Sequence, residues 1–240
     1  VADDYVGRGT PFAHWRDPHL ALQGPMVSQL PLAFVEDWHW ATDQSLIDDL
    51  VWSSEADAAD MSGLIVPTGP GDSLDTGALF FVSAIAEARK RIWIATPYFV
   101  PDIDTISALS TAALRGLDVR LLTPASADHY LIWLAAFAYF DTVREAGVRI
   151  YRYTDGFMHQ KVILIDDEIA AVGTANLDNR SFRLNFETMA VIHHRAFAGS
   201  VEKMLQADLD RCSLLTKPLK EQRPSIRIGA PIARLLAPVL

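Results

Sequence analysis

The fold of this chain is decided by residues 157–187, FMHQKVILIDDEIAAVGTANLDNRSFRLNFE. Two apolar runs in this stretch, Lys161–Ile165 and Ile169–Val172, flank the polar tripeptide DDE, which favours a turn. Short apolar runs joined by a turn of this length are typical of a β-hairpin. The stretch therefore predicts two antiparallel strands.

The register of this hairpin brings polar side chains together at its open end. With residue 165 opposite residue 169, Lys161 lies opposite Gly173 and His159 lies opposite Ala175. Successive side chains of a strand point to opposite faces, so His159 and Lys161 project from the same face. We expect both side chains to lie beside the tetrapeptide GTAN that begins at Gly173.

The groups gathered there are an imidazole, an ammonium, a hydroxyl and a carboxamide, from His159, Lys161, Thr174 and Asn176. They suit a phosphodiester. A histidine nitrogen attacks phosphorus or transfers protons near neutral pH, while Lys161 and Asn176 donate to the non-bridging oxygens whose charge grows in the transition state. Because an ammonium repels cations, we expect neither a metal ion nor a cofactor.

The same geometry separates the roles of two acidic residues. Asp166 lies at the far tip of the hairpin, five residues and roughly 16 Å from Lys161, so it is too distant to contact the histidine. Its expected role is structural, in fixing the turn or pairing with a neighbouring base. Glu187 begins the next predicted strand and is expected to return to the His159 end, where its carboxylate orients the imidazole.

Apolar runs and helical patterns alternate in the rest of the chain. Strands are expected at Leu64–Val66, Ile92–Thr96, Val119–Thr123, Val148–Tyr153 and Thr188–His193, and helices at Val27–Thr42, Gly77–Lys90, Thr105–Arg115, Tyr130–Ala146 and Ala198–Asp210. This alternation predicts βαβ units around a largely parallel, buried sheet. The apolar run from residue 130 to residue 140 is too short to span a bilayer and is expected to form a buried helix.

Composition restricts the class of function. Acidic residues outnumber basic ones by 30 to 21, and the formal net charge is -9. This balance argues against a protein held to nucleic acid by phosphate neutralisation. Half of the residues are apolar, which is enough for a substantial core, and the single cysteine excludes an intramolecular disulfide.

The spacing of the polar residues matches the signature H-x-K-x4-D-x6-G-[ST]-x-N of the phospholipase D superfamily at every defined position. In this chain those positions are His159, Lys161, Asp166, Gly173, Thr174 and Asn176. Outlying segments resemble bacterial cardiolipin synthases. They are TPYFVPD (96–102), AALRGLDVRLLTP (112–124), AGVRIYRY (146–153), NLDNRSFRLNFE (176–187) and ARLLAPVL (233–240).

The resemblance implies an α/β fold, a phospholipase D-like α/β/α sandwich with a mixed, largely parallel central sheet. It also implies a phosphatidyltransferase that joins two phosphatidylglycerols into cardiolipin plus glycerol through a phosphohistidine. In that family the glutamate of the NFE tripeptide orients the histidine, in agreement with the role expected of Glu187. The implied partners are phosphatidylglycerol and the surface of the cytoplasmic membrane, with peripheral attachment of this segment and no nucleic acid.

Members of this family carry two such signatures, one in each lobe, and the present sequence contains one. Its opening residues resemble the segment after the first signature. Residues 1–60 are therefore expected to be the tail of an N-terminal lobe plus a linker, and residues 61–240 the C-terminal catalytic lobe. By the same resemblance, Asp17 orients the histidine of the absent signature.

A missing N-terminal half or a second copy of the chain would complete the site. The sequence leaves open whether His159 is the nucleophile or the general acid and base. Three alternatives also remain: a phospholipase D, a homodimeric phosphodiesterase or nuclease, and an inactive isolated lobe.

Overall fold

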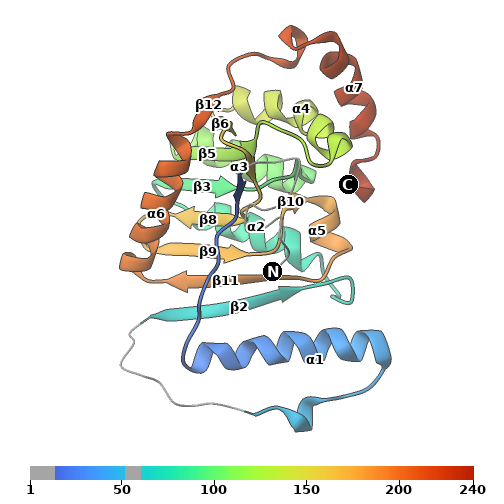
Figure 1. Cartoon of the computed structure of the whole chain (residues 1–240), viewed down its shortest axis with the longest axis vertical. Coiled ribbons are helices and arrows are strands. Elements are labelled where there is room, and N and C mark those ends of the chain that lie inside the picture. The colour runs from blue at the N-terminus through green and yellow to red at the C-terminus, as the bar shows by residue number, and fades with distance from the viewer. Residues whose placement is uncertain (1–13, 52–60) are drawn as a thin grey trace.

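The computed structural model describes residues 14–51 and 61–240, and its centre is an eight-stranded sheet (Figure 1). The strands of this sheet are β2 (Ser62–Thr68), β3 (Arg91–Ala95), β5 (Asp118–Pro124), β6 (Arg149–Tyr153), β8 (Val162–Ile165), β9 (Ile169–Gly173), β11 (Glu187–His193) and β12 (Cys212–Leu214). The helices are α1 (Gln29–Thr42), α2 (Thr76–Glu87), α3 (Ile103–Leu114), α4 (Tyr130–Glu145), α5 (Asn179–Arg183), α6 (Arg195–Leu209) and α7 (Pro224–Arg234). Two further strand pairs are short: β1 (Trp15–Arg16) with β7 (Phe157–Met158), and β4 (Phe99–Val100) with β10 (Leu177–Asp178).

The strand order is β12-β6-β5-β3-β8-β9-β11-β2, and the sheet is mixed, as expected. Five of its described strands, β2, β3, β5, β6 and β9, run in one direction, yet only the neighbours β3–β5 and β5–β6 are parallel. The other five neighbour pairs are antiparallel. Parallel pairing is thus confined to the βαβ units, because the short turn between β8 and β9 joins only antiparallel strands.

Helices cover both faces of the sheet, which confirms the α/β/α sandwich (Figure 1). Ile92 and Ile94 of β3 pack into the core shared with α2, α3 and α4. Trp93, between them, faces the opposite side and packs into the core shared with α6. The alternation of side chains along one strand therefore supplies both cores.

Helix α4 confirms the expected buried helix over most of its length, since Leu134–Phe137 and Phe140 are buried. Its first residues, Tyr130 and Leu131, are exposed. Among residues 14–51 and 61–240, the structure has no helix with the length and apolar character needed to cross a membrane.

The hairpin β8–β9 has the predicted register. Ile165 pairs with Ile169, and the Gly173 N–H donates to the Lys161 carbonyl oxygen over 3.1 Å. The predicted ladder does not continue to His159 and Ala175, because the His159 N–H donates instead to the carbonyl oxygen of Arg16, 2.9 Å away.

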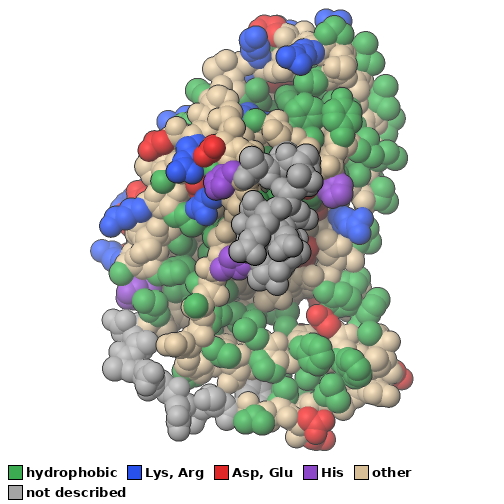
Figure 2. Space-filling model, in the orientation of Figure 1, with side chains coloured by type: hydrophobic (Ala, Val, Ile, Leu, Met, Phe, Trp, Pro, Cys, Tyr) green, Lys and Arg blue, Asp and Glu red, His purple; other side chains and the backbone are tan. Residues whose placement is uncertain are grey.

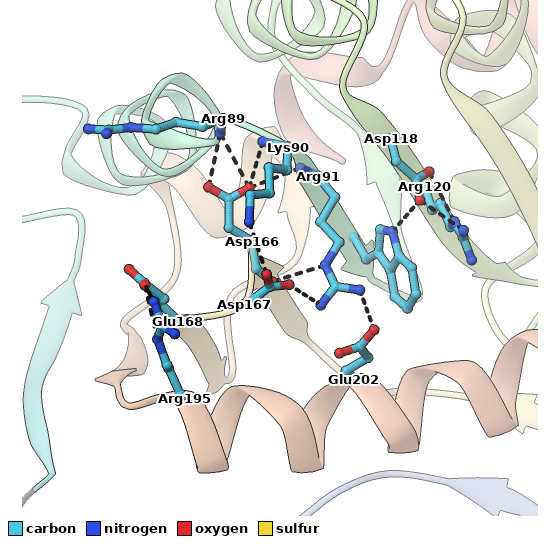
Figure 3. Close-up of polar contacts among 11 residues, drawn as sticks. Arg89, Lys90, Arg91, Asp118, Arg120, Asp166, Asp167, Glu168, Arg195 and Glu202 are labelled. Carbon is cyan, nitrogen blue, oxygen red and sulfur yellow. Dashed lines mark hydrogen bonds and ion pairs between the residues drawn. The ribbon is translucent and has the colours of Figure 1, made fainter.

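Asp166 has the structural role expected of it (Figure 3). Its carboxylate accepts backbone hydrogen bonds from Arg89 at 3.1 Å, Lys90 at 2.8 Å and Arg91 at 2.9 Å, at the start of β3. Burial of Asp166 opposes ionisation, but these three donors outweigh it and hold the pKa of the carboxyl below its ordinary value. The tip of the hairpin is thereby fixed to the neighbouring strand.

Strand β1 is fixed to the rest of the chain by an ion pair between a half-buried arginine and a buried aspartate. The Arg16 guanidinium donates to both carboxylate oxygens of Asp208 on α6, at 2.8 and 3.1 Å, and Asp208 is 2% exposed. Gln160 donates to the same carboxylate over 2.9 Å. At Gly156, where φ is +94°, a Cβ would lie 2.1 Å from the His14 carbonyl oxygen, so only glycine permits this close approach.

We expect Arg16→Ala to lower the free energy of unfolding by about 3–5 kcal/mol, because Asp208 would be buried without its cation. Urea unfolding measures this loss, and hydrogen exchange of the His159 amide reports the release of β1. Arg211→Ala is the control, since Arg211 pairs with Asp155 where both side chains are about half exposed. Equal losses for the two variants would show that β1 is not held by this pair.

A second prediction concerns Gly173, where a Cβ would lie 2.2 Å from the Thr188 carbonyl oxygen and 2.7 Å from the Met189 Cα. Gly173→Ala is expected to lower the free energy of unfolding by about 1–3 kcal/mol, because the β9 and β11 backbones must separate. Gly199→Ala in α6 is the matched control: nothing lies within 4 Å, so stability should stay level or rise. Thermal unfolding of both variants measures the two changes in stability.

Candidate active site

The imidazole of His159 lies between a carboxylate and an ammonium. Its Nδ1 is 3.0 Å from Oδ2 of Asp17, and its Nε2 is 2.9 Å from Nζ of Lys161. Because an ionised carboxylate only accepts, Nδ1 carries the proton and donates to Asp17, which leaves the Nε2 lone pair beside the ammonium. Lys161 Nζ also donates to the His159 carbonyl oxygen over 2.6 Å. The two side chains predicted to share a face are thus in direct contact.

The position of Asp17 follows from the pairing of β1 with β7. Arg16 is the parallel partner of Met158, so the next residue of each strand, Asp17 and His159, lie level with one another. The indole ring of Trp15 packs 5.3 Å from the imidazole, centroid to centroid. The role expected of Asp17 toward the histidine of an absent signature stays a prediction; in this chain its carboxylate contacts His159.

Glu187, which was predicted to orient the imidazole, has its hydrogen bonds elsewhere in this structure. Its Oε1 accepts hydrogen bonds from the Ser181 hydroxyl at 3.1 Å and from the Asn185 side chain at 3.0 Å. The carboxylate at Nδ1 of His159 is that of Asp17. Glu187 still acts on the site through its charge, because it favours the protonated form of Lys161.

Lys161 is 7% exposed, and its burial lowers the pKa of its ammonium to about 8. Four carboxylates act against burial and favour the charged form: those of Asp17, Glu187, Asp128 and Asp178. At pH 7 most of the Lys161 side chains are therefore protonated. The site keeps a cation in a place where solvent hardly reaches it, which strengthens its attraction for a phosphate oxygen.

Asn176 is buried on the loop after β9, and its side-chain Oδ1 has no hydrogen-bond partner among the described residues. Its backbone N–H donates to the Ser181 hydroxyl over 3.2 Å. Thr174 is exposed, and its hydroxyl oxygen accepts the Thr188 N–H at 2.8 Å, so it joins the end of β9 to β11. Thr174, like Gly173, therefore lies where β9 and β11 are joined.

Two acidic residues near Lys161 were not singled out from the sequence. Asp178 caps α5 by accepting the Ser181 N–H at 2.6 Å, and burial raises the pKa of its carboxyl to about 6 against this hydrogen bond. An aspartate just before a helix is a recognisable N-cap signal. Asp128 accepts a hydrogen bond from the Tyr98 hydroxyl, and no local sequence pattern predicts this contact.

The part of the chain that the structure describes holds no group of three or more His, Cys, Asp or Glu side chains suited to a metal ion.

The tautomer of His159 provides a test of this geometry. With Asp17 present, we expect the neutral ring to carry its proton on Nδ1, and Asp17→Ala should give a mixture of tautomers, because the acceptor at Nδ1 is lost. Nitrogen-15 NMR of the labelled imidazole distinguishes the two forms. Glu187→Ala should leave the Nδ1 tautomer dominant, and the opposite pattern would return the orienting role to Glu187.

Comparisons with known proteins identify the family of this chain. The family model "Cardiolipin synthase, PLD-like domain" matches residues 81–209. Cardiolipin synthase A of Pseudomonas aeruginosa strain LESB58 is 46% identical over 100% of this chain and 49% of its own length. The chain therefore spans about half the length of the curated relatives it matches.

Two solved structures share the fold. Phosphatidylserine synthase of Haemophilus influenzae Rd KW20 aligns with a TM-score of 0.58 at 19% identity, over 80% of this chain and 51% of that one. Nuc of Salmonella typhimurium, a phospholipase D family member, aligns with a TM-score of 0.55 at 21% identity, over 66% of this chain and 100% of that one. By the match of its family model over more than half of its residues, the chain belongs to the phospholipase D-like domain family of cardiolipin synthases.

Proposed function

We propose that the chain is the C-terminal catalytic lobe of a cardiolipin synthase-type phosphatidyltransferase, which joins two phosphatidylglycerols into cardiolipin and glycerol. The observation that carries the proposal is the contact between Nε2 of His159 and the ammonium of Lys161, with Asp17 at the other ring nitrogen. The curated relatives that match along the whole chain carry that activity in their names.

The proposed reaction has two steps. In the first, a histidine nitrogen attacks the phosphorus of one phosphatidylglycerol, a P–N bond forms, and the P–O bond to the glycerol headgroup breaks. The departing oxygen takes a proton from a second histidine. In the second step, a hydroxyl of another phosphatidylglycerol attacks the phosphorus and gives its proton to that second histidine as the P–N bond breaks.

His159 supplies one of these two histidines, and the other comes from the missing N-terminal half or from a second copy of the chain. In either role, Asp17 holds the Nδ1 proton and stabilises the ring when it becomes positively charged. Lys161 donates to the non-bridging oxygens as their charge grows. The amide of Asn176 is proposed to be a further donor to the same oxygens.

The proposal divides the chain at residue 60. Residues 1–60 would be the tail of an N-terminal lobe plus a linker, and residues 61–240 the catalytic lobe. Since its substrate is a membrane lipid, this segment is proposed to work peripherally at the cytoplasmic membrane.

A trapped phosphoryl-enzyme tests the mechanism. The chain, alone and together with an N-terminal lobe that carries the other signature, is incubated with phosphatidylglycerol labelled at phosphorus. We expect an acid-labile, base-stable label on the protein. In the His159→Ala variant this label is expected to be absent, or to form and then persist without transfer. Labelled DNA serves as the competing substrate. Cleavage of DNA without transfer to phosphatidylglycerol would replace the proposal with a nuclease.

The lowered pKa of Lys161 predicts an alkaline limit to the reaction. Burial favours the neutral amine, so the ammonium is lost as pH rises through about 8, and the rate of phosphatidyl transfer should fall with it. Lys161→Arg keeps a charged side chain to much higher pH, so its lower rate should not fall near pH 8. A pH–rate profile of both proteins measures this, and identical alkaline limits would exclude Lys161 as their source.

A further inference from the structure

Helix α7 and the residues after it present an apolar stripe to solvent. Ala230, Ala233 and Ala237 are buried. On the other side of the helix the exposed fractions are 60% for Ile228 and 61% for Ile232. The stripe continues through three exposed residues beyond the helix, which are Leu235, Leu236 and Val239. Contiguous exposed aliphatic side chains of this kind indicate an interaction surface.

The charge around this stripe is opposite to that of the chain as a whole. Residues 217–240 contain five basic residues and one acidic residue, whereas the complete chain has a formal charge of -9. The basic residues are Lys217, Lys220, Arg223, Arg227 and Arg234. All five are exposed, and no ion pair among the described residues includes any of them. Figure 2 shows the apolar side chains in green along the edge that carries α7, and Lys and Arg side chains in blue above them.

The arrangement of these charges matches a helix that lies flat on a bilayer. Arg227 lies on one flank of α7, away from the centre of the stripe. An arginine side chain in this position reaches phosphate groups at the surface while neighbouring aliphatic side chains enter the acyl boundary. Arg234, seven residues further on, is instead held against α4, where its guanidinium lies 4.5 Å from the centroid of the Tyr139 ring and donates to the Ala138 carbonyl oxygen at 3.4 Å.

The C-terminal segment is also joined to the elements that carry the active site. Its inner face packs against α4, where Leu134 would meet a Cβ at Gly229. The carbonyl oxygen of Leu240 accepts the N–H of Arg180 at 3.0 Å, at the start of α5. A surface that binds this segment therefore lies close to the loop that holds Asn176.

We propose that residues 217–240 form a docking surface for a bilayer rich in anionic phospholipid, with the apolar stripe of α7 inserted between the headgroups. This inference deepens the proposed function, because it names the surface through which the same site meets its lipid. Its choice of an anionic lipid rests on that function and on the basic flank. Vesicle binding tests it without any turnover.

Flotation with vesicles measures the binding, using the full chain with His159→Ala so that no lipid is consumed. We expect the protein to float with vesicles in which phosphatidylglycerol replaces a third of the phosphatidylcholine, and much less with phosphatidylcholine alone. Ile228→Ser together with Ile232→Ser should weaken binding at least about tenfold, because two inserted aliphatic side chains are lost. The control variant Leu114→Ser, in a residue that is 76% exposed elsewhere, should bind like the parent protein.

The charge is tested separately. Arg223→Gln with Arg227→Gln should weaken binding to the anionic vesicles by about fivefold for each charge removed, and added salt should reduce the difference. Lys203→Gln, an exposed lysine of α6, is the control. Failure of the parent to float, or equal flotation of all variants, overturns the inference. So does a change of oligomeric state in the stripe variant without a loss of vesicle binding, since the stripe would then contact a second copy. Normal vesicle binding combined with an absence of phosphatidyl transfer would instead contradict only the proposed function.

Discussion

The partly buried ion pair between Arg16 and Asp208 determines where β1 lies, and the geometry of the site follows from that position. Arg16 holds the strand against α6, its backbone oxygen accepts the N–H of His159, and Asp17, the next residue, reaches the imidazole. An ion pair of this kind contributes little net stability, because both charges lose their hydration. Its value lies in specificity, since other positions of β1 would leave Asp208 buried without its cation.

Lys161 shows the cost of such a site. An ammonium that is 7% exposed loses most of its hydration, and its lowered pKa records how much the fold disfavours its charge. A residue chosen for stability alone would be apolar here. The surrounding carboxylates offset part of this cost, and the hairpin that carries Lys161 is fixed at its far end by three backbone donors to Asp166. Lys161 is thus carried by a hairpin that is itself fixed in place.

The parts of the structure that local pattern controls were predictable from the sequence. The register of β8 and β9, the structural role of Asp166 and the contact of His159 with Lys161 all follow from turn chemistry and strand alternation. The contact of Asp17, and not Glu187, with the imidazole was not predictable. It depends on the pairing of β1 with β7, and Asp17 and His159 lie 142 positions apart in the sequence. Helix α7 was missed because Gly229 and Pro231 interrupt its helical pattern.

The long separation of Asp17 and His159 in the sequence affects how the protein folds. Contacts between distant segments form late, since the intervening chain must first be brought to compact order. The hairpin can assemble from its own neighbourhood, but the ring acquires its carboxylate only after the sheet and α6 have created a place for β1. We therefore expect the contact between Asp17 and His159 to form late in folding. An imidazole that is held by Asp17 would then require β1 to be docked beside β7.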